Sequence, residues 1–179
     1  MTRTTLRATL TTLAFFMSTA GGVTAVALAA DPAPAKPAST PTSVGTPAAG
    51  DPAKAVSYRH KVMKAMSDHM AAQNLLAKGE VNRPQDMAMH ATALHDLSTT
   101  IVSLYPVGTG PDVVKTEAKK EVWTQADKFT AAAQALETES AALLEVAKKG
   151  DVPAYKAQLG KVGETCGNCH DAFAVEEEH

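Results

Sequence analysis

Cysteine and aromatic residues are scarce in this chain, and each shortage excludes a class of protein. Only two of the 179 residues are cysteines, Cys166 and Cys169, which excludes a disulfide scaffold and any zinc or iron–sulfur site built from four thiolates. Aromatic residues make up 4% of the chain, which disfavours a β-sandwich and favours helices packed through alanine and aliphatic side chains. Basic residues are not in excess, since the formal net charge is -2, and this removes any case for nucleic-acid binding.

The first 29 residues have the pattern of a secretory signal. Arg3 and Arg7 form a basic start without acidic residues, an apolar stretch runs from position 10 to 28, and Ala27-Leu28-Ala29 suits cleavage after Ala29. The alternative is a membrane anchor that stays in the mature protein, which the threonine, serine and glycine interruptions disfavour. We therefore expect an exported, periplasmic protein with no stable membrane insertion once the leader is cleaved.

Proline is concentrated directly after this leader. Residues 30–52 hold six of the ten prolines, among alanine, threonine, serine and glycine. Such a segment has little apolar surface to bury, so it predicts a disordered or extended tether. The folded domain is then expected to span residues 53–179.

Apolar residues in this domain recur at alternating steps of three and four, with no alternating strand pattern. Helices are expected from Pro52 to Gly79, from about position 84 to 105, from about 119 to Gly150, and from Asp151 through Phe173, with Asp51 and Asp151 as N-caps. A mean step of 3.5 residues is the period of helices that cross at about 20° in a left-handed bundle. The fold class predicted is all-α, an antiparallel, left-handed four-helix bundle.

Each expected helix has one apolar stripe that should face the core. The predicted core positions are Val56, Met63, Met66 and Met70 in the first helix; Met87, Ala91, Leu94, Leu97, Ile101 and Leu104 in the second; Val122, Ala126, Phe129, Ala133, Leu136, Leu143 and Ala147 in the third; and Val152, Tyr155, Leu159, Val162, Cys166, Cys169 and Phe173 in the fourth.

The segment Cys166-Gly167-Asn168-Cys169-His170 has the spacing of a haem c attachment motif. On a helix, positions i, i+3 and i+4 share a face, so both thiols can add to the vinyl groups of one porphyrin while His170 faces the iron. Two other interpretations exist. A thioredoxin-like thiol pair belongs at a helix N-terminus after a strand, which is not its position here. Zinc could be bound by the two cysteines, His170 and His179.

A haem motif at the C-terminal end of an exported helical bundle resembles the cytochrome c′ family, the class II c-type cytochromes. Residues 150–173 are similar to that family's last helix. Tyr58-Arg59 with Met63-Lys64 resembles its first helix, and Glu121-Val122-Trp123 with Phe129 resembles the start of its third. The resemblance covers the whole domain of residues 53–179.

This resemblance implies a cofactor and roles for matched residues. It implies one haem c, bound covalently through Cys166 and Cys169, with His170 as the proximal iron ligand. Arg59 matches an arginine that approaches a haem propionate, which agrees with the strength of guanidinium–carboxylate pairs. The positions matching other propionate contacts are His60 and Thr116.

Met63 matches the residue that lies over the distal face of the iron, and two alternatives follow. A low-spin branch of the family uses a methionine there as the sixth ligand, and a thioether opposite histidine suits one-electron exchange. High-spin members leave the iron five-coordinate and bind small gases, in which case Met63 only fills space. Lys64, together with Ala174 where the family often has a basic residue, favours the low-spin branch.

The function we expect is a one-electron carrier that works with redox partner proteins. The alternative is a high-spin protein that binds nitric oxide or carbon monoxide and protects against nitric oxide. The tether allows a third interpretation, a module that feeds electrons to one dedicated partner. No paired carboxylates, nucleophile–base pair or phosphate loop stands out, so an enzyme is not expected. The resemblance also implies a possible homodimer through the first two helices.

Overall fold

A computed structural model of the chain describes residues 50–175. The predicted leader, nearly all of the predicted tether, and His179 lie outside the described residues. The described helices are α1 (Pro52–Lys78), α2 (Met87–Ser98), α3 (Glu121–Thr124), α4 (Ala126–Lys149) and α5 (Val152–Phe173), with 3-10 turns at Pro84–Asp86 and Ile101–Leu104. No strand occurs between residues 50 and 175, where one isolated backbone bridge joins Ala118 to Ala174.

The helix ends follow from local chemistry. The Asp51 carboxylate accepts a hydrogen bond from the Ala53 N–H (2.9 Å), and the Asp151 carboxylate accepts one from the Ala154 N–H (3.0 Å), so both predicted N-caps are confirmed. Gly79 and Gly150 end α1 and α4 in the left-handed conformation, with φ of 73° and 70°.

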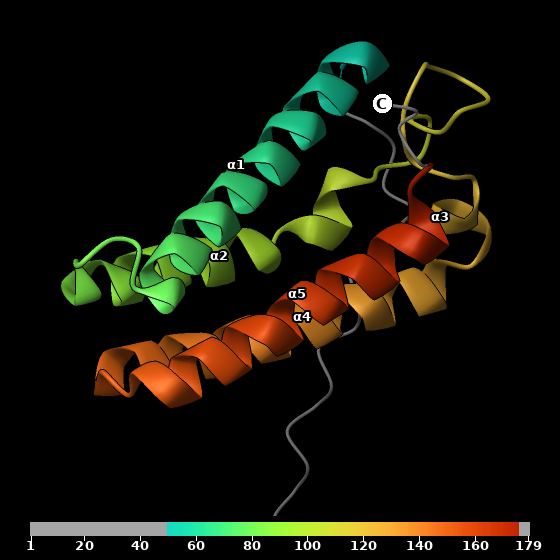
Figure 1. Cartoon of the computed structure of the whole chain (residues 1–179). Helices are drawn as coiled ribbons and strands as arrows, with labels where there is room; N and C mark the ends of the chain where they lie inside the picture. Colours follow the sequence, from blue (N-terminus) through green and yellow to red (C-terminus); the bar gives the residue numbers. More distant parts are fainter. Residues whose placement is uncertain (1–49, 176–179) are drawn as a thin grey trace, which may run out of the picture. The chain divides into compact units, whose positions relative to one another are not determined.

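The four long helices pack as a bundle. The first of them, α1, lies against α2 and α5, and α4 lies against the same two helices (Figure 1). Helices α1 and α5 run in opposite directions, and the Tyr155 hydroxyl on α5 donates to the Gln73 amide oxygen on α1 across 2.9 Å. The predicted all-α four-helix bundle is confirmed.

Most of the residues predicted in the core are buried in α2, α4 and α5. In α1 the prediction was wrong in part, because only Met66 of its predicted core residues is buried. Its buried residues are Arg59, Val62, Met66, Gln73 and Leu76. Val56, Met63 and Met70 are only half-buried. Hydrophobic periodicity could not find this face because two of its buried side chains are polar.

Smaller departures also have local reasons. Val152 was predicted in the core but is 40% exposed in the first turn of α5. The predicted second helix is α-helical only over α2, because the Thr99 and Thr100 hydroxyls donate to the Asp96 and Leu97 carbonyls, 2.8 and 2.7 Å away, and the chain tightens into a 3-10 turn. The predicted third helix is broken at Gln125, where φ is -125° and ψ 46°.

Candidate functional site

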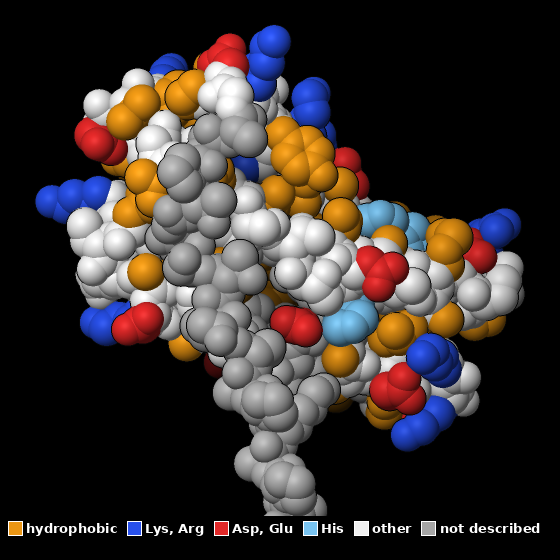
Figure 2. Space-filling view, turned by 180° about the vertical axis from the view of Figure 1, so that it is seen from behind, with side chains coloured by type: hydrophobic (Ala, Val, Ile, Leu, Met, Phe, Trp, Pro, Cys, Tyr) orange, Lys and Arg blue, Asp and Glu red, His pale blue; other side chains and the backbone are white. Residues whose placement is uncertain are grey.

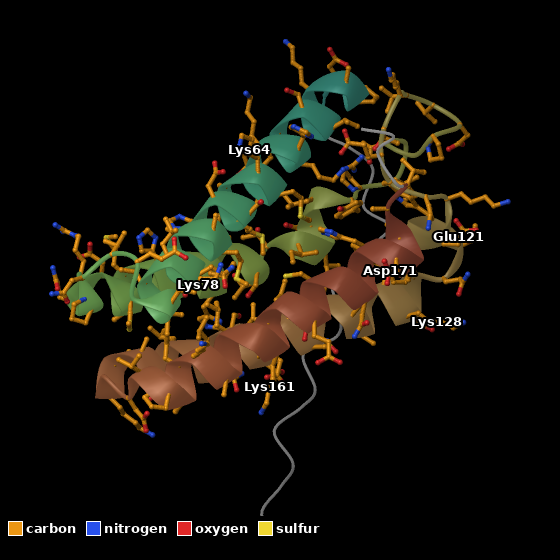
Figure 3. The ribbon with its side chains drawn as sticks, viewed as in Figure 1. Lys64, Lys78, Glu121, Lys128, Lys161 and Asp171 are labelled. Atoms are coloured by element: carbon orange, nitrogen blue, oxygen red, sulfur yellow. The ribbon has the colours of Figure 1, made fainter. Side chains whose placement is uncertain are left out.

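The Cys166–His170 motif lies in the last two turns of α5. Both cysteines are half-buried, pack against the hydrophobic core and form no disulfide, while His170 is exposed. Figure 3 shows Lys64 and Asp171 on the outside of the bundle, whereas both cysteines pack against its core. The thiols are therefore turned toward the helices that α5 packs against.

The electrostatics of the free thiols argue against a redox-active pair. Burial raises the pKa of Cys169 to about 11, and burial also raises the pKa of Cys166. Thiolate chemistry needs a lowered pKa, which the N-terminus of a helix would supply, but α5 begins at Val152, well before the motif. As for zinc, no three or more His, Cys, Asp or Glu side chains within residues 50–175 are grouped to hold a metal ion.

The end of α5 is held by the segment that precedes α3. The Lys119 N–H donates to the Phe173 carbonyl (2.9 Å), and the Val175 N–H donates to the Glu117 carbonyl (2.7 Å). Phe173 itself is buried against Phe129 of α4, with ring centroids 5.3 Å apart. The helix that carries the motif is thus fixed both by backbone hydrogen bonds and by aromatic packing.

Met63 of α1 lies at the same level of the bundle as the motif. Two contacts set the register between the antiparallel helices α1 and α5. A Cβ on Gly163 would lie 4.0 Å from the Met70 methyl carbon, and the Tyr155 hydroxyl is bonded to Gln73. Counted along the two helices, Met63 lies opposite His170 from the first contact and opposite Thr165 from the second, so it lies at the level of the Cys166–His170 motif. The Met63 side chain is half-buried and packs against the hydrophobic core.

Arg59, one turn before Met63, places a cation in the interior. Its side chain is 4% exposed, and its guanidinium lies 4.4 Å from the centre of the Tyr105 ring. It donates to the Thr116 hydroxyl (2.6 Å), to the Leu104 carbonyl and Thr109 hydroxyl (both 3.2 Å), and to the Thr109 carbonyl (3.3 Å).

All four acceptors of Arg59 are neutral, and no carboxylate lies within ion-pair distance of it in the described part of the chain. Burial lowers the pKa of Arg59, and the negative charge of nearby Glu117 partly opposes this. A buried cation is costly without an anion beside it. An anionic group such as a haem propionate would supply the missing charge.

Of the residues that the sequence placed near a propionate, Thr116 contacts Arg59, whereas His60 is exposed and lies beside Glu117, the next residue after Thr116. The His60 ring nitrogen Nδ1 lies 3.5 Å from a Glu117 carboxylate oxygen. Sequence reasoning missed Thr109 and Tyr105, which complete this cluster. No sequence pattern marks either residue, because both are distant from Arg59 in the sequence and contact it only in the folded protein.

The residues present fit a covalently bound haem. Two protonated, half-buried thiols three residues apart are followed by an exposed imidazole, and a buried cation lies one helical turn from a methionine at the same level. A helical bundle with this donor set defines the protein as a c-type cytochrome.

Comparison with known proteins names the family. The family model for cytochrome C′ matches residues 54–174. The cytochrome c′ of Pararhodospirillum photometricum is 36% identical over 118 residues, which cover 66% of this chain and 94% of that protein. The chain belongs to the cytochrome c′ family. Its cofactor is accordingly haem c, bound covalently through Cys166 and Cys169.

Solved structures agree with this family. A nitric oxide complex of a variant of cytochrome c prime from Alcaligenes xylosoxidans is 26% identical, with a TM-score of 0.66, and the match covers 72% of this chain and 98% of that one. A carbon monoxide-bound variant of the same cytochrome is also 26% identical, with a TM-score of 0.65 and coverage of 71% and 98%.

Proposed function

We propose that this protein is an exported one-electron carrier, in which His170 and Met63 would hold the haem iron. The observation that carries the proposal is the position of Met63, which lies on α1 at the level of the Cys166–His170 motif and packs against the hydrophobic core. The haem supplies the redox chemistry, a change of one electron at iron. No substrate is turned over, and the electron passes between this protein and redox partner proteins.

The protein's own residues set the conditions for that exchange. A soft thioether and an imidazole as ligands would favour the ferrous state, and because packed helices hold both side chains, their positions would change little on reduction. The hydrogen bond between Gln73 and Tyr155 fixes α1 against α5, which carry the two ligands. Arg59 would hold a propionate by charge, and His60 and Thr116 lie in the same cluster to orient it.

Visible spectra of the reduced protein, with and without carbon monoxide, test this ligation. We expect a low-spin spectrum that carbon monoxide leaves unchanged at modest concentration. Met63→Ala should become high-spin and bind carbon monoxide, whereas Met70→Leu, which alters another half-buried methionine of α1, should keep the wild-type spectrum. A wild-type protein that is high-spin and binds carbon monoxide as readily as Met63→Ala would refute the proposal.

The second candidate function is gas binding. It is favoured by the solved nitric oxide and carbon monoxide complexes of the Alcaligenes relative. A half-buried Met63 that packs without bonding would leave the iron open on that side. The same spectra decide between the candidates, because a high-spin wild-type ferrous protein that binds carbon monoxide supports gas binding.

Export rests on the predicted leader and on the covalent cofactor, which suits a compartment where lost haem could not be replaced. No helix within residues 50–175 is long and apolar enough to cross a membrane. We expect the mass of the periplasmic protein to correspond to a chain that begins at Ala30 and carries one haem. A full-length mass in the membrane fraction would contradict this.

A homodimer through α1 and α2 is the association we propose. Large apolar side chains are exposed on both helices, with Tyr58 63% and Met89 58% exposed. Light scattering should show a dimer that Met89→Lys weakens, whereas Val113→Lys, outside these helices, should leave it intact. A monomeric wild-type protein would contradict this association.

A further inference from the structure

Two histidines meet at the contact between α1 and α2, away from the haem motif. The Nδ1 atoms of His69 and His90 lie 2.9 Å apart, and the ring planes are inclined by 63°. Both side chains are half-buried, so solvent reaches the pair. Figure 2 shows histidine side chains at the surface of the bundle, among apolar neighbours.

The separation of the two nitrogens suits a shared metal ion. Zinc binds imidazole nitrogen at about 2.0–2.1 Å, so two nitrogens in neighbouring coordination positions are roughly 2.9–3.4 Å apart. The observed Nδ1–Nδ1 distance falls at the short end of this range. Without a metal, the same contact is a hydrogen bond in which one Nδ1 carries the proton.

The surroundings of His90 combine partial burial with one nearby carboxylate. Burial and the adjacent His69 lower the pKa of His90. Asp86 lies one turn before His90, and its negative charge acts in the opposite direction on that pKa while attracting cations. Its carboxylate is already bound by Arg83, so Asp86 contributes charge rather than a third ligand.

We propose that His69 and His90 chelate one divalent transition-metal ion, with water in the remaining coordination positions. Imidazole suits copper, nickel and zinc, and the order of stabilities places copper(II) first. The site is separate from the haem ligands, because His69 follows Met63 by six residues, about 9 Å along α1. A metal held there would link α1 to α2 and would stabilise the folded state by mass action.

Copper titration of the haem-loaded protein tests the proposal. The tag-free ferric protein, which has no electron to give to copper(II), is dialysed against copper sulfate, and bound copper is measured. We expect about one equivalent per chain. His69→Ala and His90→Ala should each weaken binding by about tenfold or more, since even the loss of groups that only support a metal ligand has effects of this size. His95→Gln, which changes another half-buried histidine of α2, should bind as the wild type does.

A second measurement guards against variants that fail to fold. The haem spectrum of each variant should match that of the wild type, and His69→Gln provides a milder substitution if His69→Ala fails. Copper should raise the unfolding temperature of the wild-type and His95→Gln proteins but not that of the two ligand variants. Equal copper binding by His69→Ala, His90→Ala and the wild type, or no stoichiometric binding by the wild type, would overturn the proposal.

Discussion

Replacing Tyr155 with phenylalanine removes one hydroxyl from the contact that fixes α1 against α5. Tyr155 and Gln73 are both fully buried, and the phenol donates to the amide oxygen across 2.9 Å. Burial raises the pKa of Tyr155, so the group stays a neutral donor. The residues are 82 positions apart in the chain, so the bond forms only with the tertiary fold.

The size of the effect follows from what the substitution leaves behind. Tyr155→Phe strands the Gln73 amide oxygen in the interior, which costs about 1–3 kcal/mol in the free energy of unfolding. Gln73→Leu strands the phenol instead, at a similar cost. The double variant leaves neither group unpaired, so it should be destabilised by less than the sum of the two single variants, with a coupling of about 0.5–3 kcal/mol.

Urea unfolding of the four haem-loaded proteins, followed by circular dichroism, measures this coupling. Tyr58→Phe is the matched control, because Tyr58 is 63% exposed and its change should stay within about 0.5 kcal/mol. The haem spectrum should not change in any variant, since Tyr155 precedes Cys166 by eleven residues, about 16 Å along α5. Additive single and double effects would refute the reasoning, because they would show that the two groups do not depend on each other.

Three further predictions concern the helix end, the buried phenol and the thiols. Gly150→Ala should lose about 1–2 kcal/mol of stability in urea unfolding, because φ is 70° at this position and a residue with a Cβ strains the backbone there, although its side chain would meet no other atom. Gly160→Ala is the control, because this position is helical and open, and it should lose no stability. Burial raises the pKa of Tyr105 to about 12 from about 10. The stability that this shift contributes is therefore fully present below pH 10 and is lost as the pH rises through 12. In Tyr105→Phe, the free energy of unfolding should fall less between pH 10 and 12 than it does in the wild type. The double variant Cys166→Ser, Cys169→Ser should have the mass of the haem-free polypeptide and no visible absorption, and a red product would contradict the attachment.

The features that the sequence predicted well are local ones. A cap such as Asp51 needs only the residues of its own first turn, and a left-handed glycine such as Gly150 needs only its own backbone. The haem motif is likewise contained within two turns of one helix. Each of these features is caused by residues close together in the sequence, so a short sequence pattern is enough to predict it.

The features that were missed depend on contacts between distant parts of the chain. Arg59 is buried because acceptors 45 to 57 residues away receive its hydrogen bonds, and a polar residue in an apolar stripe gives no sign of such partners. The predicted third helix breaks at Gln125, where no proline or glycine in the sequence indicates a helix end. The contact between His69 and His90 required the alignment of α1 on α2, which periodicity does not determine.

Helix α1 buries polar side chains where an apolar stripe was predicted, and it carries most of the residues to which we assign a role. Arg59 faces the segment 104–116, Met63 lies at the level of the haem motif, His69 meets α2, and Gln73 meets Tyr155 of α5. A helix that only filled a core would bury apolar residues at these positions. Sequences break local rules mainly where function or specificity requires it. Because each of these side chains binds a different neighbour, α1 is also the helix in which single substitutions can separate haem ligation, copper binding and stability from one another.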